Sequence, residues 1–309
     1  MTPAPRSYLF VPGDRPERFA KALASGADAI VLDLEDAVAP AAKPAARTAV
    51  AAWLASTPDA HRAVVRINDE STPWFADDLR MLAAVWSARS SAGSSAREGW
   101  QVSGVTDTPV VSGPGAADGG PAVMCPKAER IETLAALRAQ CPQAAVLALI
   151  ESARGVLAAP ALAAAPGVQR LVFGTLDYAL DLDLDLDAWP EPIALDAAAT
   201  AIALASRAAG LAAPVAGVTV QIDDETRLRS DLARARALGF GAKLCIHPRQ
   251  IGVVHAALSP SADDIAWARR VLAAVDSAGD QPGVLQLDGR MVDRPVIERA
   301  RRLLARARL

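Results

Sequence analysis

The sequence AIVLDLED at residues 29–36 runs from four apolar residues directly into an acidic segment. A short, uninterrupted apolar run of this kind is typical of a parallel strand that is covered on both faces. In a barrel of parallel strands, the residues that follow each strand gather at one end. The segment therefore predicts a buried strand at 29–32 whose carboxyl end carries Asp33, Glu35 and Asp36.

Seven further runs of the same type alternate with longer, alanine-rich stretches of helical character. The eight strands are predicted at residues 7–11, 29–32, 63–67, 122–125, 145–150, 170–173, 217–221 and 242–246. Helices are predicted between them, among others at 16–25, 43–56, 131–140, 195–209 and 224–238. Eight such units that close on themselves give an α/β fold of the TIM (β/α)8 barrel type. The alternative is a doubly wound open sheet, but no G-x-G-x-x-G motif follows the first strand.

The 309 residues exceed the roughly 250 residues of such a barrel, and two stretches account for the excess. Residues 87–120 are rich in Ser, Gly and Ala and lack hydrophobic periodicity, so they are predicted to form a mobile loop inserted in the barrel. The barrel domain is expected to span residues 1–259. Residues 260–309 are expected to form a C-terminal helical extension, with helices at 265–275 and 295–309 and a Gly/Asp-rich connection.

The composition is that of a folded enzyme-sized chain, with 52% hydrophobic and 22% charged residues. No run of about 18 uncharged apolar residues occurs, which argues against a membrane span. The net charge of −3 gives no indication of a nucleic-acid or anionic-membrane partner. The first residues do not resemble a signal peptide, so a cytoplasmic location is expected. Cys125, Cys141 and Cys245 are predicted to be reduced core residues, and with three histidines a zinc site is disfavoured.

Charged and polar residues follow six of the eight predicted strands. These segments are Asp33-Leu34-Glu35-Asp36, Arg66-Ile67-Asn68, Pro126-Lys127-Ala128-Glu129, Glu151-Ser152, Gly174-Thr175-Leu176-Asp177 and His247-Pro248. Active sites of TIM barrels lie at this end of the strands. Glu151 and Asp177 follow adjacent strands and offer the oxygen ligands that Mg²⁺ prefers. The alternative for this pair is a solvated glutamate and an aspartate that caps a helix.

Seven segments together resemble the citrate lyase β-subunit-like family. They are LFVPGDRPERF at 9–19, LDLEDAV at 32–38, VRIN at 65–68, PKAE at 126–129, IESARG at 150–155, FGTLD at 173–177 and CIHP at 245–248. The family belongs to the superfamily named for 4-hydroxy-2-oxoheptanedioate aldolase, which also contains malyl-CoA and citramalyl-CoA lyases. The resemblance covers nearly the whole chain in order. It implies a Mg²⁺-dependent TIM barrel that converts a 3-hydroxyacyl-CoA, such as citryl-, malyl- or citramalyl-CoA, to a keto acid and acetyl-CoA, or the reverse.

The resemblance also implies roles for individual residues. Glu151 and Asp177 correspond to the Mg²⁺ ligands of the family, and Arg66 to the arginine that binds the keto acid and the thioester oxygen. The residues expected to contact the substrate or the CoA arm are Phe10, Arg15, Lys21, Ile246 and His247. From their positions at the strand ends, Asp33, Glu35 and Asp36 are expected to orient Arg66 or metal-bound water, and Lys127 to support a strand-end carboxylate.

Each of these roles has a simpler alternative. Arg66 could serve only as a salt-bridge partner of the neighbouring carboxylates. Lys21 could be an exposed helix lysine, and His247, which precedes a proline, could be structural.

The segment DGRMVDRP at 288–295 resembles a late motif of the family. Its aspartate, here Asp293, supplies the proton acid/base, often to the active site of an adjacent subunit. The resemblance therefore implies a homo-oligomer, with a trimer favoured. The alternative is an aspartate ahead of a helix that begins at Pro295, where an anion and a proline are both favourable.

Two other functions remain open. One is a CoA-independent aldolase that acts on free 2-keto acids, but its usual early histidine base is missing because no histidine precedes His61. The other is a non-catalytic assembly subunit, which the presence of Arg66, Glu151 and Asp177 disfavours. The acidic DLDLDLD segment at 181–187 is not an EF-hand loop, because its sixth position is Leu186 rather than glycine.

Overall fold

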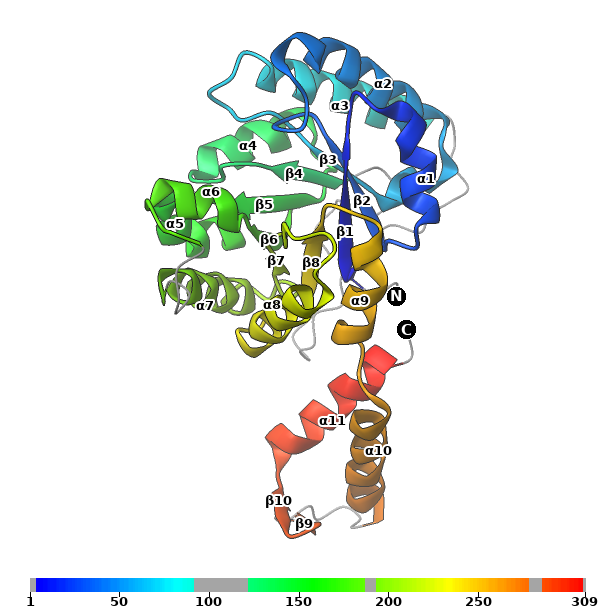
Figure 1. Cartoon of the computed structure of the whole chain (residues 1–309), viewed down its shortest axis with the longest axis vertical. Coiled ribbons are helices and arrows are strands. Elements are labelled where there is room, and N and C mark those ends of the chain that lie inside the picture. Colours follow the sequence, from blue (N-terminus) through cyan, green and yellow to red (C-terminus); the bar gives the residue numbers. More distant parts are fainter. Residues whose placement is uncertain (1–3, 92–121, 187–192, 278–284, 308–309) are drawn as a thin grey trace. The chain divides into compact units, whose positions relative to one another are not determined.

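The computed structural model of the chain describes residues 4–91, 122–186, 193–277 and 285–307. The chain divides into two compact units, Met1–His255 and Ala256–Leu309 (Figure 1). Among the described residues, no helix is both long and apolar enough to cross a membrane.

The first unit is a closed barrel of eight parallel strands (Figure 1). The strands are β1 (Ser7–Pro12), β2 (Ala29–Asp33), β3 (Ala63–Arg66), β4 (Ala122–Cys125), β5 (Val146–Ile150), β6 (Val168–Phe173), β7 (Val215–Ala216) and β8 (Ala242–Cys245). β8 pairs with β1, with Ser7 opposite Lys243. The predicted TIM barrel is therefore confirmed, and this closing pair excludes the doubly wound open sheet.

Helices connect successive strands and cover the outside of the barrel. The α-helices are α1 (Phe19–Ala24), α2 (Lys43–Ser56), α3 (Phe75–Ser91), α4 (Ile131–Gln140), α5 (Ala153–Ala164), α6 (Thr175–Asp181), α7 (Ile193–Ala208), α8 (Glu225–Ala237) and α9 (Arg249–Leu258). Short 3-10 helices precede three elements, at η1 (Pro16–Arg18), η2 (Pro40–Ala42) and η3 (Pro58–Arg62). The helices predicted at 43–56 and 131–140 have the observed bounds.

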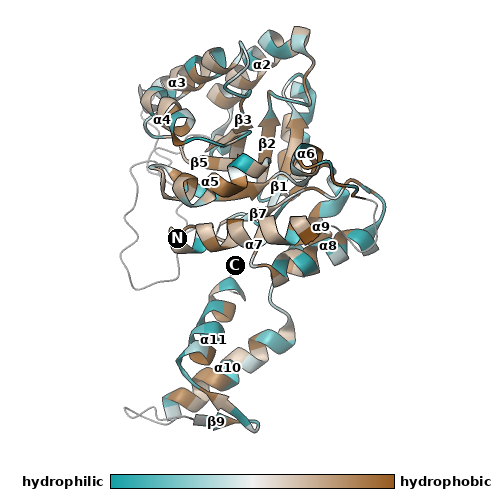
Figure 2. Cartoon of the chain, turned by 90° about the vertical axis from the view of Figure 1, so that its left-hand side faces the viewer, coloured by the Kyte–Doolittle hydropathy of each residue, from teal (hydrophilic) through white to brown (hydrophobic). Residues whose placement is uncertain are grey.

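Both faces of the strands are buried, as their continuous apolar runs predict. Along β2, Ala29 and Val31 join the cluster that fills the barrel interior, together with Val64 and Met124. Ile30, between them, points outward to the helices and is also fully buried. Figure 2 shows the strands among the hydrophobic parts of the chain. The three cysteines are free and buried, as predicted.

The prediction of a strand at 217–221 is wrong, because the seventh strand lies earlier in the chain. β7 contains only Val215 and Ala216, and the chain leaves the sheet at Gly217. A side chain at Gly217 would collide with Thr175 and with the carbonyl oxygen of Phe173. The carbonyl of Gly217 accepts a hydrogen bond from the buried Lys243 ammonium instead of a strand partner. The apolar residues that follow Gly217 give the sequence the pattern of a strand, although they do not pair in the sheet.

The helix α3 continues to Ser91, so the prediction that a loop begins at residue 87 is wrong. Arg89 holds this last turn, because its Nη1 donates to the carbonyls of Leu54 at 2.9 Å and Thr57 at 3.3 Å, at the end of α2. The turn has few apolar residues, which hid it in the sequence. Residues 92–120 of the predicted insertion lie outside the described residues.

The second unit contains α10 (Ala262–Ser277), β9 (Leu285–Leu287), β10 (Arg290–Val292) and α11 (Arg294–Ala307). Its two helices occur where helices were predicted, but the antiparallel β9–β10 hairpin was not predicted. Asp288 and Gly289 form its turn with φ of 51° and 73°, the left-handed conformation that a two-residue type I′ turn requires. Ala268, Val271, Val292, Ala300 and Leu303 form the apolar cluster of this unit.

Candidate active site

Five charged residues meet at the carboxyl ends of consecutive barrel strands. Asp33 and Arg66 are the last residues of β2 and β3 and lie opposite each other in the sheet. Lys127 follows β4, Glu151 follows β5, and Asp177 lies in α6, directly after β6. The sequence places them at the same end because all eight strands are parallel.

Arg66 and Asp33 form a two-point ion pair. The Arg66 Nε donates to Asp33 Oδ1 at 2.7 Å, and its Nη2 donates to Asp33 Oδ2 at 2.6 Å. The Asp33 carboxylate also accepts the backbone N–H groups of Glu35 and Ala37, which fixes its orientation. Burial lowers the pKa of Arg66, but the hydrogen bonds and charge of Asp33 outweigh it and raise that pKa above its ordinary range. The guanidinium is therefore permanently charged and held in one orientation.

Two more carboxylates and an aromatic ring surround the same guanidinium. The Arg66 Nη1 lies 3.1 Å from Glu35 Oε2 and 3.5 Å from Asp36 Oδ2. The ring of Phe10, from β1, lies 4.9 Å from the Arg66 Cζ. Hydrogen bonds to Asp33 and Asp36 engage three of the five N–H groups of the guanidinium, whereas Glu35 Oε2 pairs with it by charge alone. The salt-bridge alternative for Arg66 thus describes its contacts here, and an N–H group on Nη2 remains for a ligand.

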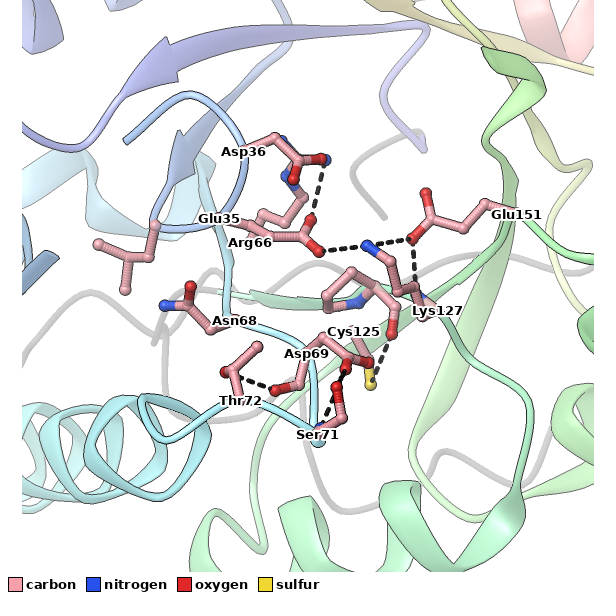
Figure 3. Close-up of polar contacts among 12 residues, drawn as sticks. Glu35, Asp36, Arg66, Asn68, Asp69, Ser71, Thr72, Cys125, Lys127 and Glu151 are labelled. Carbon is pink, nitrogen blue, oxygen red and sulfur yellow. Dashed lines mark hydrogen bonds and ion pairs between the residues drawn. The ribbon is translucent and has the colours of Figure 1, made fainter. Parts of the chain in front are cut away.

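Lys127 connects this cluster to Glu151. Figure 3 shows its ammonium between two carboxylates, with Nζ 2.8 Å from Glu35 Oε1 and 4.0 Å from Glu151 Oε1. Its backbone N–H donates to Glu151 Oε1 at 2.7 Å. Lys127 has φ of 44°, a left-handed conformation that is uncommon for residues other than glycine. The structure thus places Lys127 where the sequence predicted a supporting residue.

Glu151 is the most perturbed carboxylate of the site. Burial first, and then the charge of Glu35, raise its pKa to about 8, and Lys127 offsets only part of this rise. Asp177, which is half-buried, also raises the pKa of Glu151 and so lies near it. Glu151 Oε2 accepts no hydrogen bond from the described residues. The Lys127 ammonium, 4.0 Å from Oε1, therefore offsets only part of the negative charge that Glu151 and Asp177 would carry together.

These two carboxylates fit a hard divalent cation. Among the residues that the structure describes, no group of three or more acidic, histidine or cysteine side chains could hold a metal ion. A site built from Glu151 and Asp177 alone would leave several coordination positions for water and substrate oxygens, as Mg²⁺ prefers. The oxygen-only donor set therefore suits Mg²⁺ and is unsuited to zinc.

The side chain of Glu151 occupies the space that a side chain at position 174 would need, and the sequence did not identify this role of Gly174. A Cβ at position 174 would lie 2.7 Å from both the Cβ and Oε2 of Glu151. No side chain could occupy that position without displacing the carboxylate. Its place directly after a strand and three residues before Asp177 was the only signal in the sequence.

The sequence also did not identify Lys43, which fixes the acidic loop that follows β2 and carries Glu35 and Asp36. Its Nζ donates to the carbonyls of Leu34 and Glu35, both at 2.9 Å, and to Asn68 Oδ1 at 2.6 Å. Asn68 in turn donates to the fully buried Asp78. A lysine at the first position of a helix is usually a solvated residue, so the sequence carried no signal for this role.

Among the residues expected to contact the CoA arm, Arg15 lies on the loop after β1, and Ile246 and His247 lie on the loop after β8. Phe10 lies in β1 and Lys21 in α1. Arg15 and Lys21 are exposed, and the Arg15 Nε is 4.0 Å from Asp14 Oδ1. The backbone N–H of Ile246 donates to Gln250 Oε1 at 2.9 Å. His247 Nδ1 accepts the backbone N–H of Arg249 at 3.2 Å, which is the structural role given as its alternative.

Asp293 belongs to the second unit, and its side chain caps a helix there. Asp293 Oδ1 accepts the backbone N–H of Val296 at 3.2 Å in the first turn of α11. This contact is the alternative given for Asp293, and a cap of this type leaves the second carboxylate oxygen available. The catalytic role of Asp293 stays a prediction.

The chain matches the family HpcH/HpaI aldolase/citrate lyase over residues 6–88 and 116–248. The break in this match falls within the predicted insertion at 87–120.

Two curated relatives and one crystal structure are similar over nearly the whole chain. A citrate lyase subunit beta-like protein from Mycobacterium tuberculosis is 38% identical over 304 residues, which are 97% of this chain and 94% of the relative. A (3S)-malyl-CoA thioesterase from Cereibacter sphaeroides is 34% identical over 98% of this chain and 94% of the relative. The crystal structure of protein CitE from Mycobacterium tuberculosis, in complex with magnesium, acetoacetate and coenzyme A, is 36% identical. It covers 99% of both chains with a TM-score of 0.77.

Proposed function

Since the chain belongs to the HpcH/HpaI aldolase/citrate lyase family, we propose that it is a Mg²⁺-dependent lyase acting on the carbon–carbon bond of a 3-hydroxyacyl-CoA. The observation that carries this proposal is the buried carboxylate of Glu151, which lies near Asp177 and Arg66 and whose Oε2 accepts no hydrogen bond from the part of the chain that the structure describes. The similar CitE structure with magnesium, acetoacetate and coenzyme A supports the ligand classes.

Glu151 and Asp177 would hold the cation. When bound, Mg²⁺ supplies a Lewis acid that polarises the oxygen at the reacting carbon and orients the carboxylate of the keto acid. Glu151 is kept in place by the backbone N–H of Lys127 and by the space at Gly174. Support for this assignment comes from the raised pKa of Glu151, because a nearby cation would relieve the cost of its buried charge.

Arg66 would stabilise the negative charge that develops on the thioester oxygen. Its remaining Nη2 hydrogen is the donor available for this interaction. Asp33 holds the guanidinium rigidly, so little reorganisation is needed when charge develops. Asp33, Glu35 and Asp36 would act on the reaction only through Arg66, which they orient and keep positively charged.

The cleavage reaction needs one proton removed and one proton added. The 3-hydroxyl group loses its proton, the bond between C2 and C3 breaks, and the oxygen at C3 becomes the keto oxygen of the released keto acid. The electron pair of the broken bond passes into the thioester and gives the enolate of acetyl-CoA. Asp293 would then protonate the enolate carbon, and in condensation its carboxylate would remove that proton from acetyl-CoA.

The CoA arm would lie across the loops after β1 and β8, which are neighbours in the barrel. Phe10 and Arg15 would contact the thioester end, and the exposed Lys21 would contact a phosphate group. Ile246 and His247 would line the arm from the β8 side. We further propose a cytoplasmic homo-oligomer, with a trimer favoured by a role for Asp293 in a neighbouring subunit.

A second candidate is hydrolysis of the thioester of a malyl-CoA-type ester. The specific observation in its favour is the relative named (3S)-malyl-CoA thioesterase, which is 34% identical. The two reactions share the substrate class and differ in the bond that breaks. The CoA-independent aldolase and the non-catalytic subunit have no such observation in their favour.

The proposal is tested by Mg²⁺-dependent acetyl-CoA release from a panel of 3-hydroxyacyl-CoA esters. Glu151→Gln keeps the shape of the side chain and removes its charge, so we expect turnover to fall roughly 100-fold or more. Glu225→Gln, at an exposed position on α8, is the matched control and should leave turnover unchanged. Undiminished Mg²⁺-dependent turnover in Glu151→Gln would reject Glu151 as a ligand.

A further inference from the structure

A cavity of ≈ 180 Å³ lies between the barrel wall and the helices α7 and α8. Its walls are mainly apolar and include Phe173, Leu195, Ala199, Val218, Leu238 and Phe240. None of the residues predicted for the active site lines it. The cavity is therefore a separate feature of the barrel unit.

Lys243 is the one lysine in the lining of this cavity. Its neighbours on β8, Ala242 and Leu244, belong to the interior cluster of the barrel, so Lys243 points outward to the helices. It is only 3% exposed. Its Nζ donates to the carbonyl of Gly217 at 2.5 Å, and no carboxylate among the described residues lies within ion-pair distance of it. An ammonium has three donors, so two remain for a ligand.

The two acidic side chains in the lining are already engaged by other groups. Asp231 accepts hydrogen bonds from Thr219 Oγ1 at 2.6 Å and from Arg227 Nε at 2.8 Å. Asp196 accepts from Arg234 Nε at 2.7 Å. Burial lowers the pKa of Lys243 to about 8, although Asp231 raises it. Lys243 is thus a buried cation that lacks the partner such groups normally have.

We propose that this cavity binds a small aliphatic monocarboxylate, with the carboxylate on Lys243 Nζ and the alkyl chain among the apolar walls. Cavities of about 150 Å³ hold a benzene-sized molecule, so this one suits a ligand of about six to eight non-hydrogen atoms. The lining also holds Arg227 and Arg234, but these pair with Asp231 and Asp196, so the ammonium of Lys243 is left to match one negative charge. A phosphate group would need more donors, and a simple inorganic anion would leave the apolar walls without contacts. This inference is independent of the proposed reaction.

Isothermal titration calorimetry with hexanoate tests the proposal, with hexanamide as a neutral ligand of the same shape. We expect hexanoate to bind wild-type protein with one site and hexanamide to bind roughly tenfold or more weakly, since a charge-assisted hydrogen bond is lost. Lys243→Met should lose the preference for hexanoate. Glu151→Gln should bind hexanoate as the wild type does, because the cavity is not the active site.

Two further variants separate occupancy of the cavity from a general effect on folding. Ala199→Leu places extra volume in the cavity and leaves Lys243 intact, and it should abolish hexanoate binding. Ala208→Leu, at an exposed position on the same helix, should bind hexanoate normally. The proposal is overturned if wild-type protein does not bind hexanoate, if Lys243→Met binds it equally well, or if Glu151→Gln loses it.

Discussion

At Gly174, the absence of a side chain keeps the carboxylate of Glu151 in place. A Cβ there would lie 2.7 Å from Glu151 Oε2, far inside van der Waals contact. Overpacking of this kind typically costs about 1–3 kcal/mol and moves the side chain that gives way. The geometry of the site therefore depends on a residue that makes no polar contact through a side chain.

Gly174→Ala should lower Mg²⁺-dependent turnover at least about tenfold and destabilise the barrel by about 1–3 kcal/mol. Gly252→Ala is the matched control, because a Cβ at that position in α9 would meet no atom within 4 Å. The control should gain about 0.5–1 kcal/mol from its better helix propensity and keep its turnover. Turnover can be measured by acetyl-CoA release and stability by urea unfolding. Full turnover in Gly174→Ala would contradict the role of the close approach.

The buried ammonium of Lys243 makes stability depend on pH. The pKa of Lys243 falls from the ordinary 10.5 to about 8 in the folded chain because of burial, and Asp231, Cys245 and Arg227 modify it further. The unfolded chain therefore binds more protons between these two pH values, so Lys243 makes stability rise with pH across that window. Below pH 8 the folded chain carries the full cost of the buried charge.

Lys243→Met should remove this cost. The variant should exceed wild type in unfolding free energy by up to about 3 kcal/mol at pH 7, and the gain should shrink towards zero as the pH approaches 10.5. Urea unfolding of both proteins at pH 7 and pH 9.5 measures the difference. A gain that does not change with pH would show that the ammonium of Lys243 is not the cause.

The sequence predicted those site residues whose charge and position at a strand end can be recognised without knowing the fold. Asp33, Arg66 and Glu151 could be named because a charged residue at the end of an apolar strand is unusual. Gly174 and Lys43 could not be identified, because their roles depend on which atoms approach them across the barrel. No local pattern distinguishes a glycine beside a carboxylate from a glycine in a turn.

At the scale of elements, the loop after β2 depends on the first residue of α2. Lys43 donates to the carbonyls of Leu34 and Glu35 and to Asn68 Oδ1, three acceptors that are buried with it. Lys43→Met would leave the Leu34 carbonyl and Asn68 Oδ1 without a donor, whereas the Glu35 carbonyl keeps the N–H of Val38. The cost of one unsatisfied buried polar group is about 1–3 kcal/mol. The loop carries Glu35 and Asp36, so its loosening also affects Arg66.

Lys43→Met should therefore lower the free energy of unfolding by about 2 kcal/mol or more. Lys21→Met changes the same residue type at an exposed position on α1 and should alter stability by less than about 0.5 kcal/mol. Denaturant unfolding of the two variants gives the comparison. Equal stability of the two variants would contradict the importance of these three hydrogen bonds.

Element positions were predictable where the hydrophobic pattern matched the buried surface. β4 has the predicted bounds because all its residues are buried, and α2 because Ala46, Val50 and Leu54 form a buried stripe along it. β7 was placed too late because Val218 contacts the core without strand pairing, whereas the apolar Val220 is exposed. The last turn of α3 was missed because a side-chain contact of Arg89 holds it, and the β9–β10 hairpin because its strands are short.

At the scale of the whole molecule, the proposed mechanism combines a barrel with a second unit. The barrel carries Arg66, Glu151 and Asp177, whereas Asp293 lies in the unit Ala256–Leu309. If Asp293 serves the site of a neighbouring subunit, each complete site draws on two chains. Intersubunit complementation can test this arrangement.

Asp293→Asn and Glu151→Gln should each lower turnover roughly 100-fold or more when expressed alone. Co-expressed in equal amounts, they should recover up to about one quarter of wild-type turnover, because random assembly pairs an intact Glu151 with an intact Asp293 from its neighbour in that fraction of sites. Asp293→Leu co-expressed with Asp293→Asn is the control that should recover none. Normal turnover in Asp293→Asn alone would eliminate its catalytic role, and no recovery in the mixture would place both residues in one chain.

The products formed from a single 3-hydroxyacyl-CoA ester test the central claim most directly. Malyl-CoA incubated with purified protein and Mg²⁺ is analysed by mass spectrometry for acetyl-CoA, glyoxylate, free CoA and malate, and citramalyl-CoA for acetyl-CoA and pyruvate. A carbon–carbon lyase predicts equal amounts of acetyl-CoA and keto acid from at least one ester, lost in Glu151→Gln. Free CoA and the intact hydroxy acid, with no acetyl-CoA, would contradict it and establish thioester hydrolysis instead.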